Sequence, residues 1–284
     1  MLPLADWSLQ DRRQISGIFT DIDDTLTTAG AITPKALQAL SDLKAAGLQV
    51  IPVTGRPVGW CERFANGDPA QGVAPWPVDA LLAENGALAF APEIHDQNSL
   101  QTLSNKRKLL SKIYQQSDST RADNSARMRQ VAQRVLREMP QVRLSRDEGG
   151  RETDLAFDHH EHQQLSPQEV QQVLAILHDE GMHTTVSSIH IHGCFGDFNK
   201  WQGACWLVQH LWQRNLAQEL ERWVFVGDSG NDQAMFQHFR HSVGVANIRH
   251  CAASLRHLPR YVTPAERGAG FAQVAQAILQ AQAR

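Results

Sequence analysis

Two aspartates, Asp21 and Asp23, stand two residues apart directly after an apolar run at residues 15–19. A short apolar run that leads into polar residues is typical of a strand buried in a sheet. In open parallel sheets, ligands bind in the crevice outside the carboxyl ends of the strands. Carboxylates at such a place are suited to nucleophilic, acid–base or metal chemistry. The alternative interpretation is a charged loop capped by Thr25.

A second polar turn, Thr54-Gly55-Arg56, follows another apolar run at residues 48–53. The Thr54 hydroxyl and the backbone N–H groups that Gly55 leaves accessible can form a small cradle for an anion. Taken alone, the same residues are equally typical of a tight turn. The cradle becomes a specific hypothesis only together with other elements.

Two further elements lie in the last third of the chain. Lys200 begins a helical pattern with apolar positions on one face. Asp228, Asn231 and Asp232 follow an apolar run at residues 223–226. A single lysine is usually solvated, and a turn rich in Gly and Asp is usually structural. Four such elements, each at a strand end or a helix start, predict a single functional site instead.

The elements that must position these residues have the pattern of an α/β fold. Residues 15–54 are typical of a β-α-β unit, with a helix over residues 33–47 that has a Thr-Pro start and a Gly stop. Because such crossovers are right-handed and join parallel strands, Asp21 and Thr54 are expected at the same edge of the sheet.

The same alternation returns after residue 222. Strand patterns at residues 223–226, 242–246 and 261–263 are accompanied by a helix that starts at Gln233. Alternating strands and helices favour the α/β class. The sequence therefore predicts one doubly wound, Rossmann-like parallel sheet whose second half follows a long insertion.

The insertion, residues 95–193, has the pattern of a small α+β unit. Apolar residues at helical spacing indicate a helix over residues 125–139, and a capping box at Ser166 opens a second helix. Strand candidates lie at residues 142–144, 153–157, 183–186 and 189–192. We expect a core domain of residues 1–94 and 194–284 and an α/β cap domain of residues 95–193.

The composition is that of an ordinary globular protein, with 284 residues, 42% hydrophobic residues and a net charge of -3. This balance predicts no nucleic-acid partner and no membrane partner, and no apolar run approaches the length of a membrane span. The four cysteines form no C-x-x-C pair and the start lacks a signal-peptide pattern, so a cytoplasmic protein with reduced thiols is expected. Residues 101–151 are locally basic, with twelve Lys or Arg against five Asp or Glu. They are either a solvated helix surface or, as a set, an attraction for a phosphorylated substrate.

The four elements, in this order, resemble the motifs of the haloacid dehalogenase superfamily of phosphotransferases. The matching segments are Asp21 to Thr25, Thr54 to Arg56, Lys200, and Gly227 to Asp232. The insertion, with Glu84-Asn85-Gly86-Ala87 before it, is similar to the α/β cap of the branch that includes Cof-like sugar phosphatases, sucrose-phosphate phosphatase and phosphomannomutase. The resemblance covers residues 15–90 and 195–275, and the cap matches in position and pattern only. Asp24 and Trp201 depart from it, because Gly is common at both positions.

The resemblance implies a magnesium-dependent phosphomonoester hydrolase that acts through an aspartyl-phosphate on a small phosphorylated metabolite, above all a sugar phosphate. Asp21 would be the nucleophile and Asp23 the general acid and base. Crowded carboxylates require a cation, and oxygen ligands beside a phosphate favour Mg²⁺. By the family pattern, the metal residues are Asp21, Asp23, Asp228 and Asp232. Those that hold the phosphoryl group are Thr54, Gly55, Lys200 and Asn231.

The rest of the substrate would lie against Arg56, Asn85, His190 and His192. The histidine-rich stretch at His159, His160 and His162 is interpreted as an exposed loop rather than a metal site. The expected partner is the phosphorylated metabolite alone, with the chain as a monomer or a homodimer. Two alternatives stay open: a phosphomutase with the same core, and a non-catalytic phospho-switch module similar to receiver domains.

Overall fold

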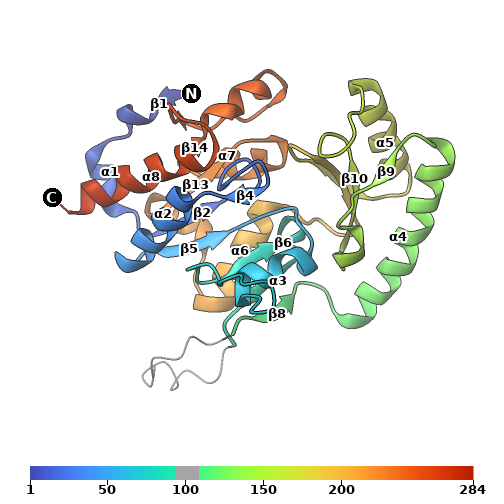
Figure 1. Cartoon of the computed structure of the whole chain (residues 1–284), viewed down its shortest axis with the longest axis horizontal. Helices are drawn as coiled ribbons and strands as arrows, with labels where there is room; N and C mark the ends of the chain where they lie inside the picture. Colours follow the sequence, from blue (N-terminus) through green and yellow to red (C-terminus); the bar gives the residue numbers. More distant parts are fainter. Residues whose placement is uncertain (94–108, 284) are drawn as a thin grey trace.

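The computed structural model describes residues 1–93 and 109–283 and has two lobes (Figure 1). The larger lobe contains both chain termini, and the smaller lobe is formed by one continuous stretch from the middle of the chain. Among the described residues, no helix combines the length and the apolar character that crossing a membrane requires.

The larger lobe is built on a six-stranded sheet whose neighbouring strands are all parallel. Its strands, in spatial order, are β1 (Leu2–Pro3), β15 (Tyr261–Val262), β14 (His241–Gly244), β13 (Trp223–Gly227), β2 (Gly17–Thr20) and β5 (Gln49–Pro52). The doubly wound sheet predicted from the sequence is confirmed. The order reverses at β2, where Thr20 is in register with Val226 on one side and with Pro52 on the other.

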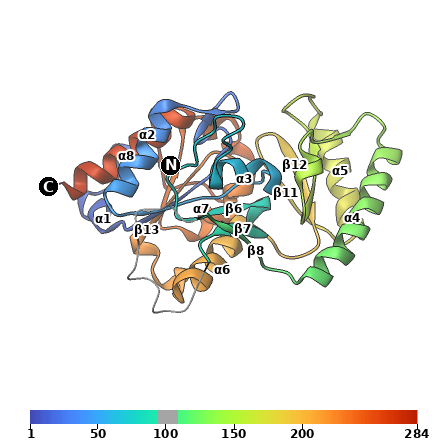
Figure 2. The same ribbon diagram turned by 60° about the horizontal axis from the view of Figure 1, so that its bottom comes forward.

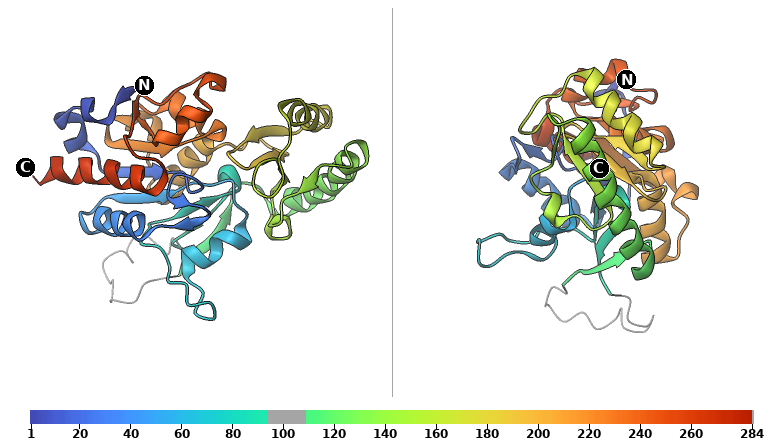
Figure 3. Two further views of the ribbon diagram at one scale, coloured as in Figure 1. Left: turned by 45° about the horizontal axis from the view of Figure 1, so that its top comes forward. Right: turned by 90° about the vertical axis from the view of Figure 1, so that its right-hand side faces the viewer.

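Helices cover both faces of this sheet because side chains along each strand point alternately to opposite faces. On one face, Ile18 and Val50 pack with α2 (Pro34–Ala45) and α8 (Arg267–Gln282), which Figure 3 shows side by side. Helix α1 (Leu9–Gln14) lies against α8. On the other face, Phe19, Ile51 and Phe225 pack with α6 (Lys200–Trp212) and α7 (Gln233–His238). α6 begins at Lys200, as the sequence indicates.

Three smaller elements complete the larger lobe. A short hairpin of β3 (Thr27–Thr28) and β4 (Ala31–Ile32) follows β2, and α3 (Val58–Asn66) follows β5. A second, antiparallel sheet is formed by β6 (Leu81–Ala83), β7 (Leu88–Ala91) and β8 (Ser111–Tyr114). Because β8 pairs with β7, Ser111–Tyr114 belongs to this lobe, and we propose that the cap begins after Tyr114 rather than at residue 95.

The smaller lobe, called the cap below, consists of residues 115–194. Its four-stranded antiparallel sheet has the order β11 (His183–Val186), β12 (His190–Cys194), β10 (Asp154–Asp158) and β9 (Arg143–Leu144). Helices α4 (Asp118–Glu138) and α5 (Pro167–Asp179) cover the outer face of this sheet (Figure 2). The predicted capping box at Ser166 is present. Helix α4 starts seven residues earlier than Ser125, because its first two turns are polar and leave no apolar period to detect.

The alternation along β12 divides the cap sheet into two faces. Ile191 packs in the apolar cluster beneath α4 and α5. Its neighbours His190 and His192 are also buried, at 1% and 3% exposure, although they point to the opposite face. That face is turned to the larger lobe and lies over the carboxyl ends of β2 and β5, as the pocket lining shared by both lobes shows.

Candidate active site

Asp21 and Asp23 lie where the central strand β2 ends. The Asp21 N–H donates to the carbonyl of Val226 at 2.8 Å, which fixes the start of the turn against β13. Asp24 has a left-handed backbone with a φ of 56°, and its N–H donates to Thr27 Oγ1 at 3.1 Å. Glycine favours this conformation and aspartate tolerates it, which explains both the family preference for Gly and the departure here.

Asp21, Asp228 and Asp232 form a buried carboxylate cluster, with one oxygen of each within 4.8 Å of the others. Burial raises the pKa of Asp21 above its ordinary value, and the ammonium of Lys200 acts in the opposite direction. Burial, together with the charges of Asp21 and Asp232, also raises the pKa of Asp228. These three desolvated carboxylates share a single ammonium, Lys200, which contacts only Asp21 and Asp232, so an excess of negative charge remains.

Lys200 lies at the centre of this cluster with no exposed surface. Its Nζ donates to Asp21 and, at 2.7 Å, to Asp232 Oδ1. The other oxygen of Asp232 accepts the N–H groups of Asp228 and Ser229, at 2.8 Å and 3.0 Å. Asp232 therefore holds the turn after β13 in place, while Asp21 and Asp228 each line a part of the space between the lobes.

The donor set of this cluster fits a hard divalent cation. Mg²⁺ is usually bound by one or two protein carboxylates, with water and substrate phosphate completing its coordination. Among the described residues, Asp228 contacts no protein cation and Asp21 contacts Lys200 through Oδ1, while Asn247 Nδ2 donates to Asp228 Oδ2 at 2.8 Å. An amide donor of this kind orients a metal-binding carboxylate without neutralising it.

The residues expected to hold a phosphoryl group lie around the same edge of the sheet. Thr54 Oγ1 accepts the Arg56 N–H at 3.0 Å and donates weakly to Asp23 at 3.5 Å. Asn231 Nδ2 donates to Asn85 Oδ1 at 3.1 Å, so these two amides position each other. A Cβ at Gly55 would lie 2.9 Å from the ring of His192, so only glycine lets the cap approach this loop so closely.

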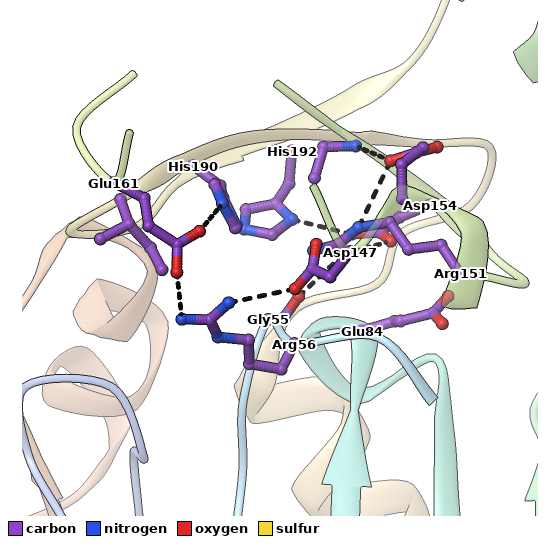
Figure 4. Close-up of polar contacts among 12 residues, drawn as sticks. Gly55, Arg56, Glu84, Asp147, Arg151, Asp154, Glu161, His190 and His192 are labelled. Atoms are coloured by element: carbon purple, nitrogen blue, oxygen red, sulfur yellow. Dashed lines mark hydrogen bonds and ion pairs between the residues drawn. The ribbon is translucent and has the colours of Figure 1, made fainter. Parts of the chain in front are cut away.

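Arg56 joins Asp23, the acid–base candidate of the core, to the cap, and Figure 4 shows its contacts with the cap. Its Nε donates to both Asp23 oxygens at 3.1 Å. Its two other nitrogens contact the cap carboxylates Asp147, at 3.1 Å, and Glu161, at 2.8 Å. A guanidinium is suited to such sharing because its donors form a rigid planar fork.

Two further charged residues at this boundary were not anticipated as site residues from the sequence. Arg151 donates to the carbonyl of Gly55 at 2.9 Å and to Asp154 at 2.8 Å (Figure 4). Glu84 accepts the N–H and the hydroxyl of Thr153 from the cap and the N–H of Val58 from the core. We call the contacts made by Arg56, Arg151 and Glu84 the seam.

His192 differs from its neighbour His190 in how its ring is used. His190 Nε2 lies 2.9 Å from Glu161, whereas His192 Nδ1 lies 2.8 Å from Asp154. The second nitrogen of His192, Nε2, is buried and has no hydrogen-bond partner in the part of the chain that the structure describes. Burial lowers the pKa of His192 well below its ordinary value, so the neutral ring donates from Nδ1 and offers Nε2 as an acceptor.

Two regions of the space between the lobes lie beside the catalytic residues. An inner cavity of about 10 Å³ is lined by Asp21, Asp23, Arg56, His190 and His192, among others. This is room for a single water molecule, so a phosphate ester can enter only if the cap moves. A wider cleft of about 1010 Å³ opens beside it, between cap strand β11 and core residues around Asp228.

The remaining cap predictions have different outcomes. His159 and His160 lie in a turn that lines the wider cleft, and the ring of His159 contacts the carbonyl of Ser187 at 3.1 Å. Part of the basic segment, residues 101–108, lies outside the described residues. Arg121 and Arg134 are paired with carboxylates of their own surroundings, so their charge is locally neutralised. Attraction of substrate by this segment stays a prediction.

A doubly wound core with carboxylates at its central strand ends and an inserted cap defines a phosphatase of the haloacid dehalogenase superfamily. Two family models agree with this class. The haloacid dehalogenase-like hydrolase model matches residues 18–130, and the sucrose-6F-phosphate phosphohydrolase model matches residues 111–281. Because the second match covers more than half of the chain, the chain belongs to the sucrose-6F-phosphate phosphohydrolase family.

Solved structures share the fold at low sequence identity. A Thermoplasma acidophilum protein has a TM-score of 0.64 at 17% identity, over 93% of this chain and 98% of its own. The sucrose-phosphatase of Synechocystis, solved with sucrose and phosphate, has a TM-score of 0.63 at 17% identity, over 94% of this chain and 98% of its own. A haloalkanoate-superfamily phosphatase from Bacteroides thetaiotaomicron has a TM-score of 0.60 at 14% identity, over 99% and 98%. No curated protein matches the sequence.

Proposed function

We propose that this phosphatase is Mg²⁺-dependent and hydrolyses a sugar phosphate through an aspartyl-phosphate on Asp21. One observation supports this most directly: the excess negative charge of the buried cluster formed by Asp21, Asp228 and Asp232. A bound cation and a phosphoryl group would together make use of that charge, since proteins hold Mg²⁺ through one or two carboxylates and substrate phosphate. The sugar is proposed because the matching family is described by a sugar phosphate and a neighbour was solved with sucrose.

The chemistry assigns unequal roles to the first two aspartates. A carboxylate oxygen of Asp21 attacks phosphorus, and the bond from phosphorus to the ester oxygen breaks. Asp23 donates a proton to that leaving oxygen, then takes a proton from the water that attacks the aspartyl-phosphate, which releases phosphate and restores Asp21. Asp23 must be protonated for the first step, so its contact with Arg56 has to loosen when substrate enters.

The remaining core residues hold the group in transfer. Lys200, Thr54 and Asn231, with the N–H of Gly55, donate hydrogen bonds to the phosphoryl oxygens as charge develops on them. Bound Mg²⁺ would be held by Asp21 and Asp228, with the Asp23 carbonyl, and would neutralise charge on the phosphoryl group. Asp232 keeps Lys200 and the turn after β13 in position.

The cap supplies the contacts that distinguish one phosphate ester from another. With Nδ1 held by Asp154, His192 presents Nε2 as a buried acceptor beside the reacting groups. A buried acceptor without a partner disfavours apolar leaving groups and is satisfied by a hydroxyl. A substrate with a free hydroxyl near its phosphoester carbon is therefore favoured, and the wider cleft accommodates the bulk of the sugar. Arg56, Asn85 and His190 complete this substrate site.

The test is phosphate release from a panel of phosphate esters that includes sucrose 6F-phosphate, hexose phosphates and phenyl phosphate. We expect activity on sugar phosphates with Mg²⁺, none with EDTA, and a loss of at least about 10⁴-fold in Asp21→Asn. Asp123→Asn is the matched control, because Asp123 is exposed on α4, outside the catalytic cluster and the cleft. Equal rates for wild type and Asp21→Asn would refute the proposal.

The same proposal places the reaction in the cytoplasm. All four cysteines have free thiols, which agrees with action in the reducing cytoplasm. The partner is the small phosphorylated metabolite, bound by a monomer or a homodimer.

A further inference from the structure

A second group of metal-ligating side chains lies at the opposite edge of the central sheet. Among the described residues, Asp11, Glu221 and His241 each have one ligand atom within 4.8 Å of the others. His241 is the first residue of β14, Glu221 precedes β13, and Asp11 belongs to α1. This group is at the amino ends of the parallel strands, whereas the catalytic aspartates follow the carboxyl ends. It is therefore separate from the active site.

His241 supplies an independent indication that something is bound there. Its side chain has no exposed surface, and neither Nδ1 nor Nε2 has a hydrogen-bond partner among the described residues. The ring of Trp7 packs against it with a centroid distance of 5.6 Å. A buried ring nitrogen without a partner is costly, and a metal ion is one of the few partners that removes the cost.

The two carboxylates face this ring from different elements. Glu221 Oε2 lies 3.7 Å from His241 Nε2, too far for a hydrogen bond but suited to an intervening ion. Arg240 donates to the other oxygen, Oε1, so Glu221 is oriented from behind while Oε2 stays available. An outer partner of this kind is typical of carboxylates that bind metals. Arg240 also limits the excess charge of the group.

The donor chemistry selects the kind of ion. One imidazole nitrogen and two carboxylate oxygens suit Zn²⁺, whereas Mg²⁺ and Ca²⁺ prefer oxygen ligands alone. Tetrahedral Zn²⁺ with bonds of about 2.1 Å needs ligand atoms about 3.4 Å apart. Asp11 and Glu221 are partly exposed, and the Glu221 side chain is 53% exposed. Both side chains can therefore rotate inward and shorten the separations between ligand atoms from within 4.8 Å to about 3.4 Å. A water molecule would complete the coordination.

We infer that Asp11, Glu221 and His241 form a structural binding site for Zn²⁺ or a similar transition-metal ion. Such an ion would tie α1, the turn before β13 and the start of β14 together. These segments are separated by up to about 230 residues in the chain, and a bridge between distant segments stabilises the native state by linkage. The site does not depend on the proposed function, since it shares no residue with it.

The experiment uses the full chain in millimolar Mg²⁺, so that the carboxylates around Asp21 compete poorly for the added metal. Binding of Zn²⁺ is measured by calorimetry, and Co²⁺ serves as a second probe through its visible absorption in tetrahedral sites. We expect about one equivalent of tight binding and a rise in the melting temperature of about 5 °C at saturating Zn²⁺. His241→Gln and Glu221→Gln should each lose that equivalent and that rise.

Two choices keep the result interpretable. Glu221 is half exposed, so Glu221→Gln tests the site even if a change at the buried His241 impairs folding. His257→Gln is the matched control, because His257 is an exposed histidine outside the group. If wild type takes up no Zn²⁺, or if wild type and Glu221→Gln take up the same amount with the same thermal shift, the site does not exist.

Discussion

The catalytic cluster and the seam are both buried and highly charged, but they balance their charges differently. In the cluster, Lys200 is the only cation that contacts Asp21 and Asp232, and Asp228 contacts none among the described residues. In the seam, Arg56 and Arg151 each contact several carboxylates, and Glu84 is saturated by donors from both lobes. One region keeps free capacity for a cation and a phosphoryl group, whereas the other uses its charges to hold the lobes together.

The physical reason for the difference is the type of partner. Backbone N–H groups and guanidinium forks satisfy a carboxylate completely and in fixed geometry. A single ammonium between carboxylates does not satisfy them completely, and a bound cation can offset the repulsion that remains between them. Buried charge that is not fully paired therefore indicates a binding site, whereas fully paired buried charge indicates a structural role.

The largest effect is expected from a change at Asp23, the core partner of Arg56. Asp23→Asn should lower kcat by about 10²- to 10⁴-fold, because the amide can neither donate the proton nor take it back. An ester with a good leaving group, such as p-nitrophenyl phosphate, should lose less, since it needs less protonation. If both substrates lose the same factor, Asp23 has a structural role and belongs to the seam. Steady-state kinetics on the two esters decide the matter.

A change in the seam should cost stability rather than chemistry. The Arg151 side chain is 1% exposed and contacts Asp147 and Asp154. Arg151→Gln leaves Asp154 without its arginine partner and Asp147 with Arg56 alone, and should lower the free energy of unfolding by about 3–5 kcal/mol. Urea denaturation measures this, with Arg146→Gln as the control, because Arg146 is exposed. A loss under about 1 kcal/mol in Arg151→Gln would show that the seam is not charge-balanced as described.

Magnesium should stabilise the cluster and leave the seam unaffected. At a concentration about 100 times its dissociation constant, Mg²⁺ should raise the free energy of unfolding by about 2.7 kcal/mol. Asp228→Asn should abolish this gain, and Glu161→Gln should keep it. Thermal melts with and without Mg²⁺ provide the comparison. A gain that persists in Asp228→Asn would place the cation elsewhere.

The smallest effect concerns pH. Burial would raise the pKa of Glu161, but hydrogen bonds from His190 and Arg56 outweigh it and lower the pKa to about 2, from an ordinary value of 4.5. A lowered pKa means that this contact contributes stability above pH 4.5 and loses it as the pH falls toward 2. Between about pH 6 and pH 3.5, wild type should lose about 1 kcal/mol more than Glu161→Gln. Urea titrations of both proteins at the two pH values measure these losses. Equal losses in wild type and Glu161→Gln would contradict the prediction.

Sequence reasoning was most successful where the signal is local. The apolar runs before Asp21, Thr54 and Asp228 predicted buried strands, and parallel pairing places their ends at one edge of the sheet. The start of α6 at Lys200 and the capping box at Ser166 were also detectable from neighbouring residues. The first turns of α4 and the pairing of β8 were not, because neither has an apolar period that distinguishes it from a polar loop.

The sequence by itself determined the class of fold and the order of the four core elements, because strand ends and helix starts are specified within a few residues. Only the tertiary structure decided that Arg56 contacts both Asp23 and Glu161 and that Glu84 joins the lobes. It also decided that His192 and His241 have ring nitrogens with no hydrogen-bond partner among the residues that the structure describes. These contacts join residues from about 30 to more than 200 positions apart. No local pattern marks them, since burial and charge balance are properties of the packed molecule rather than of any segment.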